Sequence, residues 1–169
     1  IINVLSKNKQ ACTYYSGEVK YLPNQNETPN DIRLLFLDIN LIDNSEHPYK
    51  EIKSRLVTVL KRVIPENNHP YVLVYWSRHE RDKNIIEEIF EDDLPTRKPI
   101  SYTSAIKSDF FDFEGNFIAE EDDIQRLIQL PNELLKDHLS YKYLLEWENI
   151  IHRSSNITIK EIFDNAPDQ

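Results

Sequence analysis

The sequence contains no methionine, one cysteine and only two glycines, against nine prolines, in 169 residues. Because Cys12 is alone, the chain has no internal disulfide framework, which fits the reducing cytosol. Few turns can use the positive φ of glycine, so asparagine and aspartate must take these positions. The absence of methionine and the start at Ile1 lead us to expect that this chain is part of a longer protein.

Basic residues and long apolar runs are also scarce. The net charge is −9, with 20 Lys and Arg against 29 Asp and Glu, which argues against a nucleic-acid surface. No apolar run approaches the ~20 residues that span a bilayer, and no secretory leader is visible. We therefore expect a cytoplasmic domain that binds neither nucleic acid nor membrane. At this length the chain can bury a single hydrophobic core.

Three short segments are predicted to be strands, and the first two are apolar runs typical of buried parallel strands. They cover residues 32–38, 71–77 and 100–106, and each is followed by a polar or charged residue or ends in one. A β-rich segment at 11–16, just before Gly17, predicts a further strand.

Amphipathic helices are predicted between and after these strands. Apolar residues recur at helical spacing over 49–64 and 80–93. The C-terminal part predicts helices over about 119–138 and 139–153, then a short helix with a capping box at Thr158-Ile-Lys-Glu161. Strands that alternate with helices indicate an α/β fold with a parallel sheet. We expect two parts, an α/β domain at 1–118 and a helical extension at 119–169.

Three chemically useful side chains follow the predicted strands. Asp38, Ser77 and Lys107 each stand where a strand ends. Functional groups of parallel sheets collect at the carboxyl ends of the strands, so we expect these three to converge. A carboxylate can accept a phosphoryl group, a hydroxyl can hydrogen-bond it, and an ammonium can neutralise its charge.

These segments resemble the receiver domains of bacterial response regulators. "DIRLLFLDINL" is similar to the third strand of that CheY-like, or flavodoxin-like, doubly wound fold, "YVLVYWS" to the fourth and "ISYTSAIK" to the fifth. The resemblance implies that Asp38 is the phosphoacceptor, Ser77 the switch hydroxyl and Lys107 the phosphate-binding lysine. Lys98-Pro99 also mimics a family signature, but no strand precedes it, and we prefer Lys107.

The resemblance covers about residues 1–118 and implies parts that this chain lacks. Receivers have the strand order 2-1-3-4-5, so the first strand, with its paired acids that hold Mg²⁺, would precede Ile1. The metal ligands therefore cannot be assigned to residues here. The loop after Asp38 also lacks the family's glycine, which suggests a diverged receiver or pseudo-receiver. Such a module would control a protein partner or a fused effector, in bacterial signalling or anti-phage defence, rather than act as an enzyme.

Two other functions are open. Haloacid dehalogenase-like phosphohydrolases also have a strand that ends in Asp-x-Asp, but here Asn40 replaces the second Asp, the general acid. A structural oligomerisation domain would expose an apolar stripe at Leu144, Trp147 and Ile151 and form a homo-oligomer.

Each candidate residue could also have a purely structural role: Asp38 and Ser77 as helix caps or loop residues, and Lys107 as a surface lysine. The five histidines show no metal-ligand spacing.

Overall fold

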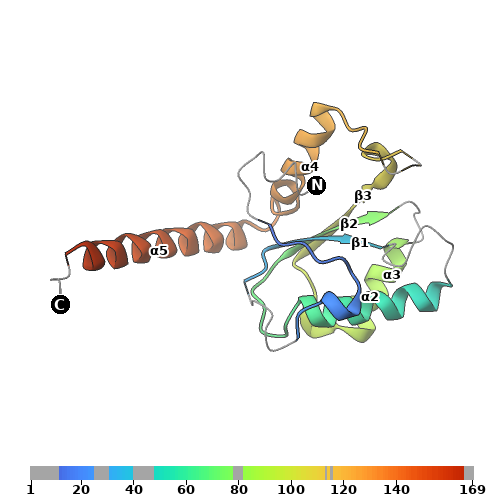
Figure 1. Cartoon of the computed structure of the whole chain (residues 1–169), viewed down its shortest axis with the longest axis horizontal. Helices are drawn as coiled ribbons and strands as arrows, with labels where there is room; N and C mark the ends of the chain where they lie inside the picture. The colour runs from blue at the N-terminus through green and yellow to red at the C-terminus, as the bar shows by residue number, and fades with distance from the viewer. Residues whose placement is uncertain are drawn as a thin grey trace. The chain divides into compact units, whose positions relative to one another are not determined.

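The computed structural model describes residues 12–24, 31–39, 48–77, 82–112, 114 and 116–165 (Figure 1). It divides the chain into two compact units, the first up to Pro131 and the second from Asn132. The first unit is a mixed α/β structure around a parallel sheet, as the sequence predicts. The helix predicted from residue 119 contributes its first turns to this unit.

The sheet consists, within the described residues, of strands β1 (Leu34–Asp38), β2 (Val72–Ser77) and β3 (Ser101–Ile106). All pairs are parallel and the spatial order is β1-β2-β3, so β2 is central. Helix α2 (Tyr49–Val63) connects β1 to β2, and helix α3 (Asp82–Glu88) follows β2. Each strand lies within the segment predicted for it, and β2, which is buried on both faces, is the most apolar of the three.

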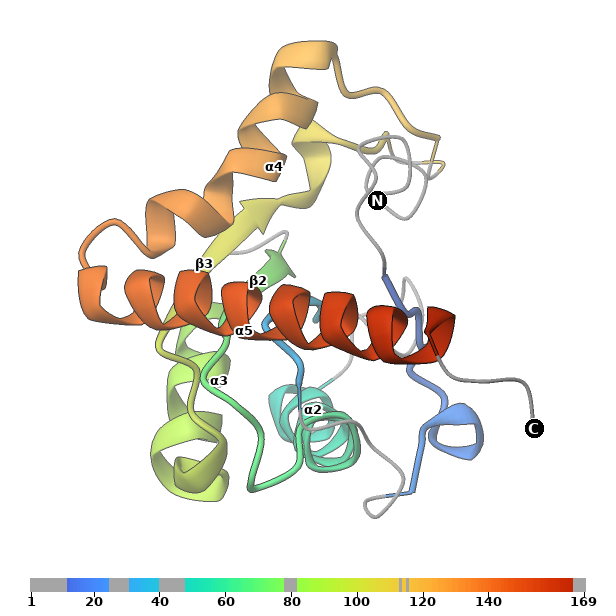
Figure 2. The ribbon, with the colours of Figure 1, turned by 90° about the vertical axis from the view of Figure 1, so that its left-hand side faces the viewer.

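The main core lies on one face of the sheet, where α2 and α3 pack side by side (Figure 2). It joins Leu37 of β1 and Leu73 of β2 to the apolar side of α2, including Leu56 and Leu60, which are fully buried. The helical spacing of these α2 residues is therefore explained by contact with the sheet. The helix ends before Pro65, as predicted.

The other face of β2 is buried as well. Val72, Val74 and Trp76 alternate with the core residues and are at most 5% exposed. Helix α4 (Glu121–Leu134) lies, up to Pro131, on this side of the sheet, opposite α2 and α3 (Figures 1 and 2). Helices on both sides of a parallel sheet are compatible with a doubly wound fold.

Helix α3 continues as a π-helical turn, η2 (Ile89–Asp93), within the segment predicted to be helical. The backbone N–H of Leu94 donates to the carbonyl oxygen of Ile89 at 2.7 Å, which closes the wider turn. A wide turn at this point leaves Ile89 and Phe90 fully buried. It also places Asp93 within reach of α2, as described next.

Lys53 of α2 binds two carboxylates across this helix contact. Its Nζ lies 3.1 Å from Oε2 of Glu88 and 3.1 Å from Oδ2 of Asp93. The Tyr49 hydroxyl also bonds Glu88, and that bond, together with Lys53, lowers the pKa of Glu88. Burial and then the Glu88 contact raise the pKa of Tyr49 to about 12. The cluster thus holds α2 against α3 by charge in addition to apolar contact.

At the end of the sheet where the strands begin, side chains form hydrogen bonds with backbone groups. Asn68 donates from Nδ2 to the Ile32 carbonyl and accepts the Ile32 N–H at Oδ1, before β1 starts. Arg97, in the short helix η3 (Pro95–Arg97), donates to the Ile64 carbonyl, and its own carbonyl accepts the Tyr71 hydroxyl at 2.7 Å. These bonds satisfy backbone groups at strand starts, which indicates a structural role.

The strand predicted at residues 11–16 is wrong for the part that the structure describes. Residues 12–16 form no strand, and Cys12, Thr13 and Tyr14 are exposed. The segment instead turns at Gly17, whose φ of 79° suits glycine, and enters the short helix η1 (Val19–Tyr21). Residues with high β-propensity form a strand only where a neighbouring strand pairs with them, and this segment has no such neighbour among the described residues.

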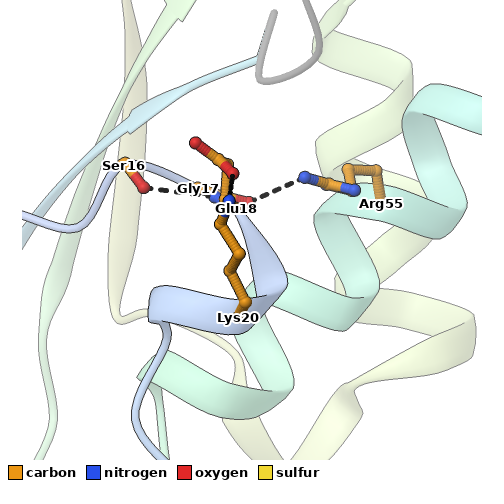
Figure 3. Close-up of polar contacts among 5 residues, drawn as sticks. All are labelled: Ser16, Gly17, Glu18, Lys20 and Arg55. Atoms are coloured by element: carbon orange, nitrogen blue, oxygen red, sulfur yellow. Dashed lines mark hydrogen bonds and ion pairs between the residues drawn. The ribbon is translucent and has the colours of Figure 1, made fainter.

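Contacts with α2 hold this turn in place (Figure 3). Arg55 of α2 donates from Nη2 to the carbonyl oxygen of Gly17 at 3.1 Å, and the Glu18 N–H donates to Oγ of Ser16 at 3.4 Å. Lys20 forms an exposed ion pair with Glu18. The described part of the N-terminal segment is therefore attached to α2 by these bonds, and Leu22 joins the core between α2 and the sheet.

The second unit contains α5, one continuous helix from Leu139 to Asp164. The sequence predicted two helices with a capping box at Thr158, and this prediction is wrong. The hydroxyl of Thr158 donates to the Ser154 carbonyl at 3.0 Å, a bond made inside a helix. Because a threonine hydroxyl can serve either role, the motif alone does not tell a helix start from a helix interior. In the described part of the chain, no helix combines the length and apolar character of a membrane span.

Truncation of a core residue tests the packing of α2 on the sheet. We expect Leu60→Ala to lower the free energy of unfolding by about 3 kcal/mol, because the side chain is fully buried. The neighbouring Lys61 is exposed, so Lys61→Ala should change it by less than about 0.5 kcal/mol. Urea unfolding followed by circular dichroism measures both, and equal effects would contradict this packing.

The Lys53 cluster predicts a loss of stability in acid. The folded state lowers the pKa of Glu88 below its ordinary value of 4.5. The contribution of the Glu88 carboxylate to the free energy of unfolding is therefore complete above pH 4.5, and it disappears as the pH falls through the pKa of Glu88 in the folded state. When the midpoint of unfolding is plotted against pH, the wild-type midpoint should fall in acid, and Glu88→Gln should reduce this fall. Glu91→Gln, an exposed residue of the same helical segment, serves as the control and should keep the wild-type profile.

Candidate functional site

The carboxyl ends of the three strands meet at one edge of the sheet. In the strand register, Asp38 of β1 lies beside Trp76 of β2, and Trp76 lies beside Ala105 of β3. Ser77 is one residue further along β2, and Lys107 comes directly after β3. The register therefore brings the three predicted residues to one edge, as parallel strands require.

Asp38 and Lys107 form an ion pair across this edge. Nζ of Lys107 donates to Oδ2 of Asp38 at 2.7 Å, and 69 positions of sequence separate the two residues. The Lys107 side chain is 21% exposed and that of Asp38 is 38% exposed. The pair is thus partly shielded from water but open to a molecule that approaches the edge.

The ion pair joins the two outer strands of the described sheet over the end of the central one. Because β2 separates β1 from β3, Lys107 must reach across β2 to contact Asp38. Its long aliphatic stem allows this reach, which a shorter basic side chain would not have. Ser77 is the last residue of β2 and pairs with Ile106, so its backbone lies between the two charged residues. The predicted loop residue Asn40 lies outside the described residues.

Aromatic side chains border the ion pair. Trp76 is 5% exposed and stacks with Phe36 of β1 at a centroid distance of 6.4 Å. It also meets Phe110 edge-on at 5.0 Å and Phe111 at 6.3 Å, measured between ring centroids. These contacts keep Trp76 in place beside Asp38.

The same aromatic residues connect Lys107 to the chain that follows. Lys107 begins the short helix η4 (Lys107–Asp109), and its carbonyl oxygen accepts the N–H groups of Phe110 at 3.2 Å and Phe111 at 3.0 Å. Phe111 then pairs with Phe117 in an isolated antiparallel bridge. A displacement of Lys107 would therefore disturb the residues that pack on Trp76.

Sequence reasoning missed this aromatic cluster. The signal was present, because Trp76 precedes Ser77 and two phenylalanines follow Lys107 closely. In isolation such residues indicate only core packing, and their proximity to one another depends on the sheet register.

Lys98 lies before β3, at the opposite end of the strands from Asp38. The preference for Lys107 over Lys98 therefore agrees with the geometry.

Metal ligands are not assigned by the geometry. Within the described ranges, no group of three or more His, Cys, Asp or Glu side chains is placed to hold a metal ion. Comparison of the chain with protein-family models, curated proteins and solved structures found no match.

A double-mutant cycle measures the strength of the Asp38–Lys107 pair. We expect Asp38→Asn and Lys107→Met to have non-additive effects on the free energy of unfolding, with a coupling of about 1 kcal/mol, because the pair is partly exposed. The coupling should shrink as salt is added, since mobile ions screen accessible charges. Strictly additive effects would show that the contact contributes nothing to stability.

Proposed function

We propose that this chain is a receiver-like regulatory module in which Asp38 accepts a phosphoryl group. The observation that carries the proposal is the 2.7 Å ion pair of Asp38 with Lys107, which spans the end of β2 at Ser77. A carboxylate at the end of a parallel strand can accept a phosphoryl group, and a lysine in contact with it can neutralise the added charge. The position of Ser77 at the end of the strand between them supports the same function.

The proposed reaction is a transfer from a phosphorylated donor, such as a phosphohistidine or an acyl phosphate. A bond forms between phosphorus and a carboxylate oxygen of Asp38 while the bond from phosphorus to the donor breaks, and the donor atom keeps the electron pair. Lys107 then donates to the phosphoryl oxygens in place of the carboxylate. Because Lys107 already lies at the edge, this exchange needs only a small movement of its ammonium group.

The output of the module would follow from that movement. Lys107 is covalently part of η4, and the backbone of η4 bonds Phe110 and Phe111, which contact Trp76. Phosphorylation would thus shift the equilibrium between two arrangements of the segment after β3, and a protein partner or fused effector would bind one of them. This is a signalling role, in which the chain itself does not turn over a substrate.

Beryllofluoride, a mimic of an aspartyl phosphate, tests the proposal with Trp76 as the reporter. The chain has two tryptophans, so Trp147→Phe leaves Trp76 as the only one. In this background, with Mg²⁺ present and with the strand that the receiver resemblance places before Ile1 included in the protein tested, we expect a saturable change in fluorescence. The change should vanish in Asp38→Asn, and in Lys107→Met it should require at least about tenfold more ligand, since a charged hydrogen bond is lost.

Asp109→Asn is the matched control, because Asp109 is an exposed aspartate close to Lys107 at the start of the same segment. It should respond as the parent does. An unchanged response in Asp38→Asn, or none in any variant, would refute phosphorylation at Asp38, and the second result would favour a degenerate receiver. Sustained hydrolysis of a phosphate monoester would instead favour the dehalogenase-like function.

A further inference from the structure

Helix α5 exposes a large apolar surface. None of its residues is buried, although it is 26 residues long and rich in large apolar side chains. Trp147 is 62% exposed and Ile150 is 63% exposed. A contiguous apolar surface of this kind marks a contact site in proteins.

Part of this exposed apolar surface follows heptad spacing on one side of α5, whereas Ile159 and Phe163, which are also exposed, lie on the other side. Trp147 and Ser154 occupy one core position of the heptad, and Tyr143, Ile150 and Ile157 occupy the other. Leu144 and Ile151 widen the same stripe, because each follows a core position. We call this set the α5 stripe: Tyr143, Leu144, Trp147, Ile150, Ile151 and Ile157.

We propose that the α5 stripe binds the α5 stripe of a second copy of this chain, with the two helices antiparallel. In the antiparallel register that places Trp147 opposite Ile150 of the second copy, Ser154 lies opposite Tyr143. A small residue thus faces a large one, which lets the core layers fill evenly. On one flank, Leu144 lies opposite Ile151 of the second copy.

The charges on the other flank match in the same register. Glu146 lies opposite Arg153 of the second copy, and by two-fold symmetry Arg153 lies opposite Glu146. Both residues are exposed beside the stripe in the free chain. The register that packs the core therefore also forms two ion pairs of opposite charge, although nothing in the apolar pattern requires this.

A parallel pair would not have these features. Each residue would then lie near its own copy, so Trp147 would meet Trp147 and Ser154 would meet Ser154, which alternates an overfilled layer with an underfilled one. Glu161, at a core position, would face a second Glu161, and like charges repel. The antiparallel pair avoids this contact, because Glu161 lies beyond its overlapping part.

The contact is small, and this determines how it is measured. A standard protein interface uses about 20–30 residues a side, whereas only the residues on one side of this helix would touch. We therefore expect a dissociation constant in the micromolar range. Sedimentation of the full chain over a wide concentration range should show a monomer–dimer equilibrium.

The first test disrupts the α5 stripe at its centre. Ile150→Asp should make the chain monomeric at every concentration, because the substitution would bury an unpaired charge against Trp147 of the other copy in each of the two central layers. Asn149→Asp adds the same charge to the adjacent residue, outside the stripe, and should change the dissociation constant less than about threefold. Circular dichroism checks that both variants keep their helix. A wild-type chain that is monomeric at every concentration would overturn the proposal.

The second test uses charge reversal and mixing, which a different partner or a parallel pair would not reproduce. Glu146→Arg alone and Arg153→Glu alone should each raise the dissociation constant about tenfold, because two attractions become two repulsions. An equimolar mixture of the two variants should dimerise as well as the wild type, since every flanking pair is then opposite in charge. Failure of the mixture to recover would overturn the antiparallel pairing.

The Asp38→Asn variant should dimerise normally. The test of dimerisation is therefore independent of the test of phosphorylation at Asp38.

Discussion

The burial of β2 on both faces constrains the rest of the first unit. Leu73 faces the core with α2 and α3, while Val74 and Trp76 are buried on the other face. Because both faces exclude water, a charged residue has no stable place along this strand. Along β2 a charge can be accommodated only where the strand ends, and Asp38 and Lys107 form their ion pair beside that end. The chemistry of the edge is thus a consequence of the apolar sheet.

The ion pair at that edge is suited to change. Both side chains retain some exposure, and a partly exposed pair contributes only modestly to stability. A fully buried pair would be costly to separate, because each charge would lose its partner in a medium of low polarity. Lys107 can therefore exchange one acceptor for another without unfolding the sheet. The tight packing around Trp76 gives such a movement a structural consequence, because close-packed aromatic residues cannot shift independently.

The second unit follows a different principle. The first unit buries its apolar residues within itself, whereas α5 exposes them along its length. The continuous helix keeps the α5 stripe on one side, and a break after residue 153 would have separated Ile157 from the rest of the stripe. The continuity of the helix and the exposed stripe therefore belong together, since heptad spacing forms a single surface only along an unbroken helix.

The sequence by itself determined the elements whose burial leaves a periodic pattern. The three strands, α2 and the helical segment after β2 were all predictable, because an apolar residue at each buried position records the packing. It also indicated that Asp38, Ser77 and Lys107 share an edge, since parallel strands end on the same side. It failed where one pattern permits two structures, as at residues 12–16 and at Thr158. Only the tertiary structure decided that Lys107 reaches Asp38 and that aromatic residues surround them, because these contacts depend on the order and register of the strands.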